Sequence, residues 1–250
     1  MSMSENPQEQ PVTTPAGQWV GSTHWSAVLA AGRPGSPQAA AAMEELCRSY
    51  WYPLYAYIRR RGYQVEEAQD LTQAFFAGII ENHWLKSADP QRGRFRSFLL
   101  GAMNHFLAKH WRQAHTLKRG GGKTFVSLDD TAEGRYALEA ASDLTPEKIY
   151  ERRWAWSLFE RAVGRLREQY AAAGKAELYD ALKGFLTEDV DEGDYARLAA
   201  ELDMTSGAVT TAVHRLRDRC RELVREEVAH TVADPAEVED EMRSLLAALD

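Results

Sequence analysis

Basic and aromatic side chains alternate in one segment of the chain that holds no acidic residue. Between Pro90 and Lys123 there are eight Lys or Arg and three His, but not one Asp or Glu. The rest of the chain has 22 basic against 37 acidic side chains. Lysine and arginine follow a phosphate backbone by displacing counterions, and aromatic rings stack on unpaired bases. The segment therefore predicts a surface for single-stranded nucleic acid, although a solvated basic helix with an ordinary apolar stripe explains the same pattern.

Short polar residues and arginines follow a helix cap near the C-terminal end. Residues 195–202 have the apolar spacing of a short helix, Asp203 and Met204 suit a turn, and Thr205 suits the cap of a second helix. This pattern is typical of a helix-turn-helix, which places its second helix in the major groove of DNA. Any two short helices joined by a turn give the plainer interpretation.

The outward-facing positions of this second helix have two predicted tasks. Five short or polar residues near its start can approach base edges: Ser206, Gly207, Thr210, Thr211 and His214. The arginines that follow, of which Arg215 and Arg219 are the main candidates, can reach phosphates and position the protein without specifying sequence.

Helical periodicity covers most of the chain, so we predict an all-α fold with two helical domains joined by a flexible linker, the C-terminal domain containing the helix-turn-helix. Three consecutive glycines, Gly120–Gly122, cannot hold a packed element and mark the linker. Thr145 suits the cap, and Pro146 the first position, of the helix that begins the C-terminal domain. The predicted units are a disordered tail (1–20), an N-terminal domain (21–115), the linker (116–145), a C-terminal domain (146–232) and an acidic amphipathic tail helix (233–250).

The tail helix carries an apolar stripe that has to be buried somewhere. Asp234 and Pro235 form a helix start, and five apolar residues fall on one face: Val238, Met242, Leu245, Leu246 and Leu249. Two hypotheses follow. Either the helix completes the core of the C-terminal domain, or it docks beside the arginines after His214 and lowers DNA affinity.

Composition narrows the class of protein. No apolar run approaches the length needed to cross a bilayer, and the N-terminus has no signal-peptide pattern. Cys47 and Cys220 lie far apart on apolar stripes, which favours reduced core residues in a cytoplasmic protein. No nucleophile–base pair, metal-spaced His/Cys set or phosphate-binding loop is evident, so we expect neither an enzyme nor a metal or cofactor.

Taken in order, these motifs resemble the bacterial extracytoplasmic-function sigma factors. Residues 65–80 (VEEAQDLTQAFFAGII), where we predict a helix from about Val65, are similar to the helix of that family that binds core RNA polymerase, with the matches Asp70, Leu71, Gln73 and Phe76. We expect Asp70 and Gln73 to be exposed beside a partly exposed Phe76. Residues 92–112 (RGRFRSFLLGAMNHFLAKHWR) are similar to the helix that melts and captures the minus-ten element. The resemblance implies DNA contacts there from Arg96, Asn104, Lys109, His110, Trp111 and Arg112.

The C-terminal motif completes the resemblance. Residues 208–223 (AVTTAVHRLRDRCREL) are similar to the helix of the family that reads the minus-thirty-five element, with Asp203 in place of the usual turn glycine. The resemblance implies a sigma factor whose partners are core RNA polymerase and promoter DNA, and in addition an anti-sigma factor or other regulator. A helix-turn-helix regulator that is not a polymerase subunit, and an RNA-binding regulator, are the alternatives.

Overall fold

The structure, a computed structural model, describes residues 37–81, 94–116, 143–187 and 191–249, and the single residues Leu85, Asp89 and Tyr136. Within these residues every regular element is helical, in agreement with the all-α part of the prediction. In chain order the elements are α2 (Pro37–Arg60), α3 (Val65–Glu81), α4 (Phe95–Thr116), α6 (Pro146–Ala172), α7 (Ala176–Leu182), η3 (Lys183–Leu186), α8 (Glu192–Glu201), α9 (Ser206–Ala229), η4 (Pro235–Glu237) and α10 (Val238–Leu249).

Side-chain caps start two of the longest helices where the sequence predicted them. The Thr145 side chain accepts a hydrogen bond from the backbone N–H of Lys148 at 3.3 Å, and Pro146 occupies the first helical position of α6. The Thr205 side chain accepts from the N–H of Ala208 at 3.2 Å at the start of α9. These caps satisfy amide groups that the first helical turn leaves without a partner.

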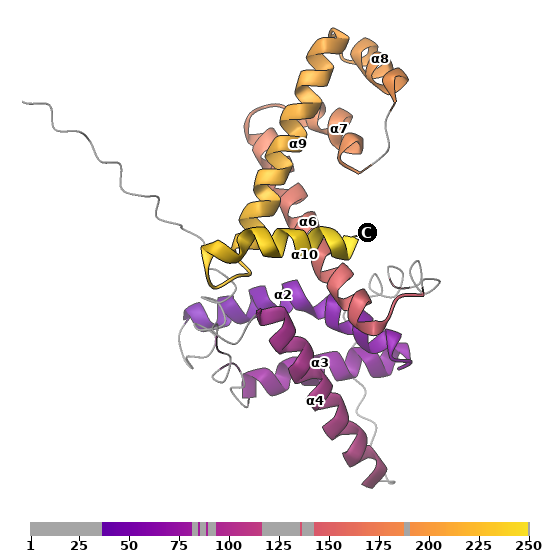
Figure 1. Cartoon of the computed structure of the whole chain (residues 1–250), viewed down its shortest axis with the longest axis vertical. Helices are drawn as coiled ribbons and strands as arrows, with labels where there is room; N and C mark the ends of the chain where they lie inside the picture. The colour runs from indigo at the N-terminus through magenta and orange to yellow at the C-terminus, as the bar shows by residue number, and fades with distance from the viewer. Residues whose placement is uncertain are drawn as a thin grey trace, which may run out of the picture.

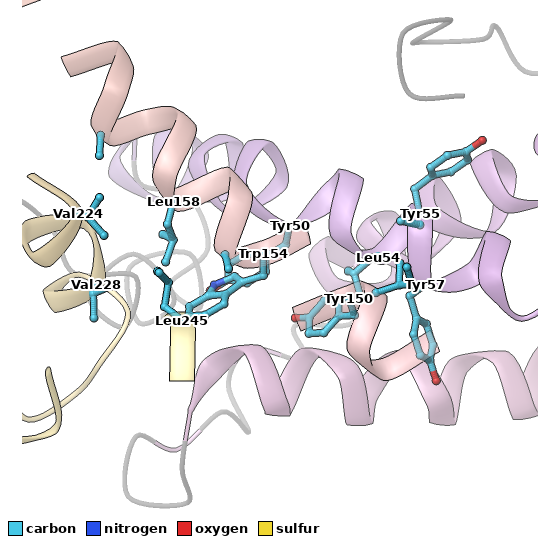
Figure 2. Packing of buried hydrophobic residues seen from close by; sticks show 14 of the residues in the cluster. Tyr50, Leu54, Tyr55, Tyr57, Tyr150, Trp154, Leu158, Val224, Val228 and Leu245 are labelled. Atoms are coloured by element: carbon cyan, nitrogen blue, oxygen red, sulfur yellow. The ribbon is translucent and has the colours of Figure 1, made fainter. Parts of the chain in front are cut away.

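Helix α6 joins the two ends of the molecule. It packs against α2, α9 and α10, and Figure 1 shows it running from the layer of α2, α3 and α4 towards α7, α8 and α9. One connected cluster of buried apolar side chains extends along it, from Leu54 of α2 through Trp154 and Leu158 to Val224 of α9 (Figure 2). The helix that begins the predicted C-terminal domain therefore also packs on α2, in the predicted N-terminal domain.

Helix α10 corresponds to the predicted tail helix and crosses α6 (Figure 1). Leu245 is buried, with only 1% of its surface exposed, whereas Leu246 is 56% exposed. The predicted apolar stripe is therefore buried in part, against α6 and α9. The predicted disordered tail (1–20) and most of the predicted linker (116–145) lie outside the described residues.

Candidate functional site

A groove of about 450 Å³ runs between α3 and α4. Asp70, Gln73 and Glu67 of α3 line it together with His110 of α4. Asp70 is exposed and Gln73 is half-buried, so both polar side chains are accessible at the groove. The structure thus places residues predicted to bind polymerase beside a residue predicted to bind DNA.

The two apolar members of the predicted polymerase-binding set are buried. Leu71, which lines the groove, is 3% exposed, and Phe76 is 6% exposed. The sequence interpretation expected Phe76 to be partly exposed, which is wrong. Its ring packs edge-to-face on Phe75 at 5.7 Å between centroids, because both rings belong to the core face of α3.

The C-terminal half of α4 is a basic and aromatic surface. Lys109, His110, Trp111 and Arg112 are exposed, and Trp111 keeps 57% of its surface accessible. The His110 ring stacks on Phe106 with centroids 6.3 Å apart. Since most large apolar side chains of the described residues are buried, an indole this exposed among cations suits contact with a partner.

Asn104 lies in the middle of α4 and is joined to the end of α2. Its Oδ1 accepts hydrogen bonds from the hydroxyl of Tyr57 and from Nη1 of Arg61, each at 2.6 Å. Both acceptor directions of the amide oxygen are therefore in use, and the orientation of the side chain is fixed. Any contact from Asn104 to DNA would have to come from its amide nitrogen.

Arg96 requires a correction, because the structure does not expose it to DNA. Its side chain is buried, stacks over the Trp154 ring at 4.2 Å and forms an ion pair with Glu241 of α10. Burial lowers the pKa of Arg96 to about 10, and the charge of Arg94 acts in the same direction, so the guanidinium is still protonated at neutral pH. Sequence alone could not show this, because the acidic partner lies 145 positions away.

The predicted base-reading residues gather on one face at the start of α9. Five predicted residues are exposed there: Ser206, Gly207, Thr210, Thr211 and His214. The hydroxyls of Thr210 and Thr211 donate to backbone carbonyls four residues earlier in their own helix, at 2.9 Å each. Their methyl groups and remaining lone pairs stay available on this surface.

The turn before α9 has left-handed backbone geometry at Asp203, with a φ of 51°. Glycine adopts this conformation without strain, and aspartate is one of the few other residues that adopt it readily. The backbone N–H of Met204 then donates to the carbonyl of Ala199 at 2.9 Å and closes the end of α8. Asp203 therefore performs the conformational task for which glycine is the usual residue.

The arginines of α9 differ in how far they are neutralised. Arg219 donates to Gln169 at 2.9 Å and pairs with Glu222 at 2.8 Å, and Arg221 pairs with Asp218 at 2.8 Å. Arg215 is exposed and has no acidic partner among the described residues. The sequence predicted phosphate contacts from both Arg215 and Arg219, and only Arg215 is ready to make one without giving up an ion pair.

Arg215 lines a hollow of about 340 Å³ between α6, α7 and α9. Lys175 adds a second cation, and Tyr170 adds an aromatic wall. Burial raises the pKa of the Tyr170 hydroxyl, and the charge of Arg215 acts against this rise. The tyrosine is therefore a neutral hydrogen-bonding group beside two cations, which suits an anionic group such as phosphate.

Sequence reasoning missed Arg61 as a member of the α4 surface. Arg59, Arg60 and Arg61 are consecutive at the end of α2, and this run was the available signal. The structure separates their roles. Arg59 stacks over Tyr136 at 4.9 Å and Arg60 donates to the carbonyl of Leu144 at 2.7 Å, whereas Arg61 is exposed and bonds to Asn104.

The described part of the chain holds no group of three or more His, Cys, Asp or Glu placed to bind a metal ion. None of its helices is long and apolar enough to span a bilayer. In comparisons with known protein families, curated proteins and solved structures, the chain has no significant match.

Proposed function

We propose that the chain is a sigma factor of the extracytoplasmic-function type, a dissociable cytoplasmic subunit that directs core RNA polymerase to promoters. One observation carries this proposal. The groove between α3 and α4 adjoins the exposed basic and aromatic half of α4, while the polar face of α9 lies at the opposite end of the molecule (Figure 1). A protein that reads two separated DNA elements and binds an enzyme needs surfaces of these three kinds.

The pair α8 and α9 would act as the helix-turn-helix of the C-terminal domain (146–232). A helix that enters the major groove contacts base edges with its first turns, where Ser206, Thr210, Thr211 and His214 are exposed. Arg215 and Lys175 would hold the adjacent phosphates and thereby set the position of α9 along the groove.

The exposed half of α4 would hold the strand that becomes unpaired. Extruding a base costs a few kcal/mol of stacking and pairing. Trp111 and His110 offer ring faces on which a base can stack, and Lys109, Arg112 and Arg61 supply backbone charge. Because the stacking contacts form only with unpaired bases, they favour the open promoter over the closed one.

The groove between α3 and α4 would bind core polymerase. Asp70 and Gln73 present acidic and amide groups beside the apolar floor that Leu71 supplies. A polar rim around a small apolar centre is the usual composition of a protein–protein interface. The acidic chain as a whole, with a net charge of −7, limits binding to DNA in the absence of the enzyme.

Co-purification with bacterial core polymerase tests the proposal. The wild-type chain should form a stable complex, and Asp70→Arg should abolish it without loss of helix content by circular dichroism. Glu66→Arg is the matched control, because Glu66 is an exposed carboxylate of α3 that does not line the groove. Failure of the wild-type chain to bind, together with specific duplex binding by the free chain, would instead favour the helix-turn-helix regulator.

A further inference from the structure

Helix α10 is held in place by a buried carboxylate as well as by apolar contacts. Figure 2 shows Leu245 lying towards Trp154 and Leu158 of α6, with Val224 and Val228 of α9 beyond it. One turn earlier in α10, Glu241 is only 1% exposed. A carboxylate this deeply buried requires compensating charge.

Two arginines at the start of α4 provide that charge. The Arg94 Nε atom lies 2.8 Å from Glu241 Oε2, and Arg96 forms an ion pair with Oε1. Arg94 also donates from Nη1 to the hydroxyl of Ser244 at 2.9 Å. Through Arg96 and its stacking on Trp154, α10 is therefore tied to α4 and α6 at once.

This attachment is specific and depends on charges that are buried from solvent, since Arg96 is 6% exposed and Glu241 1% exposed. Buried ion pairs stabilise little when desolvation is counted, whereas removal of one partner strands the other charge. An interface of this kind fixes one position of the helix and can also be released, because both charges regain water on opening.

The apolar side of α10 also indicates that this helix can be released. Met242, Leu246 and Leu249 line a groove of about 450 Å³ shared with α6, η3 and α9, and Leu246 is largely exposed. Cys220 of α9 lines the same groove and is itself 5% exposed. Detachment of α10 would uncover this thiol.

Helix α10 also brings acidic charge to α9. Glu239 of α10 pairs with Arg225 of α9. While α10 is attached, it neutralises an arginine of the helix that the proposed function assigns to DNA, and it ties the start of α4 to α6 and α9. We therefore expect attachment of α10 to oppose the binding of polymerase and DNA by separate surfaces of the chain.

We infer that Glu241 is a releasable latch that holds α10 on Arg94 and Arg96 in the free chain, and that release of α10 favours binding to core polymerase. The latch differs from both hypotheses for the tail helix, because its contacts are on α4 as well as on the core. The effect on polymerase rests on the proposed function, but the structural step can be measured without it.

The structural test uses the two native thiols of the full chain. Glu241→Gln removes the charge with little change in shape, and Asp240→Asn is its control, because Asp240 is exposed and pairs with Arg243 in the same helix. Alkylation by N-ethylmaleimide is followed by peptide mass spectrometry. Glu241→Gln should accelerate modification of Cys220 by about 100-fold, because it strands the charge of Arg96. Cys47 on α2 should react at an unchanged rate.

Ser244→Ala is a milder variant that removes the hydrogen bond from Arg94 and the one that the Ser244 hydroxyl donates to the Asp240 carbonyl. It should give a smaller acceleration at Cys220. Two results would overturn the latch. One is an unchanged Cys220 rate in Glu241→Gln relative to Asp240→Asn. The other is equal acceleration at Cys47 and Cys220 with loss of helix content, which would show that α10 cannot leave without global unfolding.

The functional test measures the affinity of the same variants for core polymerase. If release limits binding, Glu241→Gln should bind about tenfold or more tightly than Asp240→Asn, since a larger fraction of the chain is competent. Equal affinities would overturn the opposition between latch and polymerase. If neither variant nor the wild-type chain binds, the proposed function fails, and the Cys220 rates still decide whether the latch exists.

Discussion

The two halves of α4 carry similar charge and have opposite environments. At its start, Arg94 and Arg96 are tied to a buried glutamate of α10, and Arg96 stacks on Trp154. At its end, Lys109 and Arg112 are exposed beside Trp111. In the sequence both halves belong to one segment free of acidic residues.

The difference shows that the role of a basic segment cannot be assigned until the partners of its side chains are known. Arg96 is structural here because Glu241 reaches it from the other end of the chain. We propose that the second half of α4 is the half that binds nucleic acid.

Loss of the buried arginine should affect stability most. Arg96→Met leaves the Glu241 carboxylate with Arg94 as its only cation, and should lower the free energy of unfolding in urea by about 3–5 kcal/mol. Arg112→Met should change it by less than about 0.5 kcal/mol, because that side chain is on the surface. Adding Glu241→Leu to Arg96→Met should recover most of the loss. Equal effects of the two single variants would contradict the division.

Loss of the exposed indole should affect promoter opening and leave stability intact. Trp111→Ala should weaken the open complex by about 1–3 kcal/mol, the usual contribution of a base–aromatic stack. Permanganate footprinting of the unpaired promoter DNA in the polymerase complex measures this weakening. Ile80→Ala, at an apolar side chain of similar exposure on α3, is the control. An unchanged footprint would remove Trp111 from the melting surface.

At the opposite end of the molecule, Thr211 should affect sequence preference alone. Thr211→Arg should change the preferred bases of the upstream element by about 1–3 kcal/mol in discrimination, because its side chain is exposed at the start of α9. Selection from randomised upstream elements reports the change, and Arg215→Ala should weaken all sequences alike. An unaltered consensus for Thr211→Arg would place the residue outside the reading face.

The smallest effect concerns the salt dependence of binding to promoter DNA. Replacing both Lys109 and Arg112 by Ala should lower the slope of log affinity against log salt by about 1.4–1.8, since each lost phosphate contact removes about 0.7–0.9. The double variant Arg48→Ala, Lys183→Ala removes the same charge from α2 and η3 and should leave the slope unchanged. Equal slopes for all three proteins would show that the end of α4 does not bind phosphates.

The sequence predicted the helices well because caps and apolar spacing are local signals. Thr145 and Thr205 cap helices at the predicted positions, and α3 begins at the predicted Val65. Burial was harder to predict. Phe76 lies on the core face of α3, and Arg96 is covered by α6 and α10, so both environments depend on distant segments.

Ion pairing of the α9 arginines was also beyond sequence reasoning. Arg219 reaches Gln169, and Arg225 reaches Glu239, across gaps of 50 and 14 residues. Only the fold decides which of several regularly spaced arginines meets a carboxylate. Neither Arg215 nor Arg217 has an acidic partner among the described residues, and Arg217 donates instead to the carbonyl of Phe185 at 2.9 Å. The availability of Arg215 could therefore not have been read from the sequence.

Promoter-dependent transcription by reconstituted polymerase tests whether the chain is a sigma factor. Core enzyme is combined with the chain and with a library of templates carrying chromosomal upstream regions, and the start sites are sequenced. We predict initiation at a distinct subset of templates that share two elements, lost with Asp70→Arg and retained with Glu66→Arg. Initiation that is the same with and without the chain would contradict the claim.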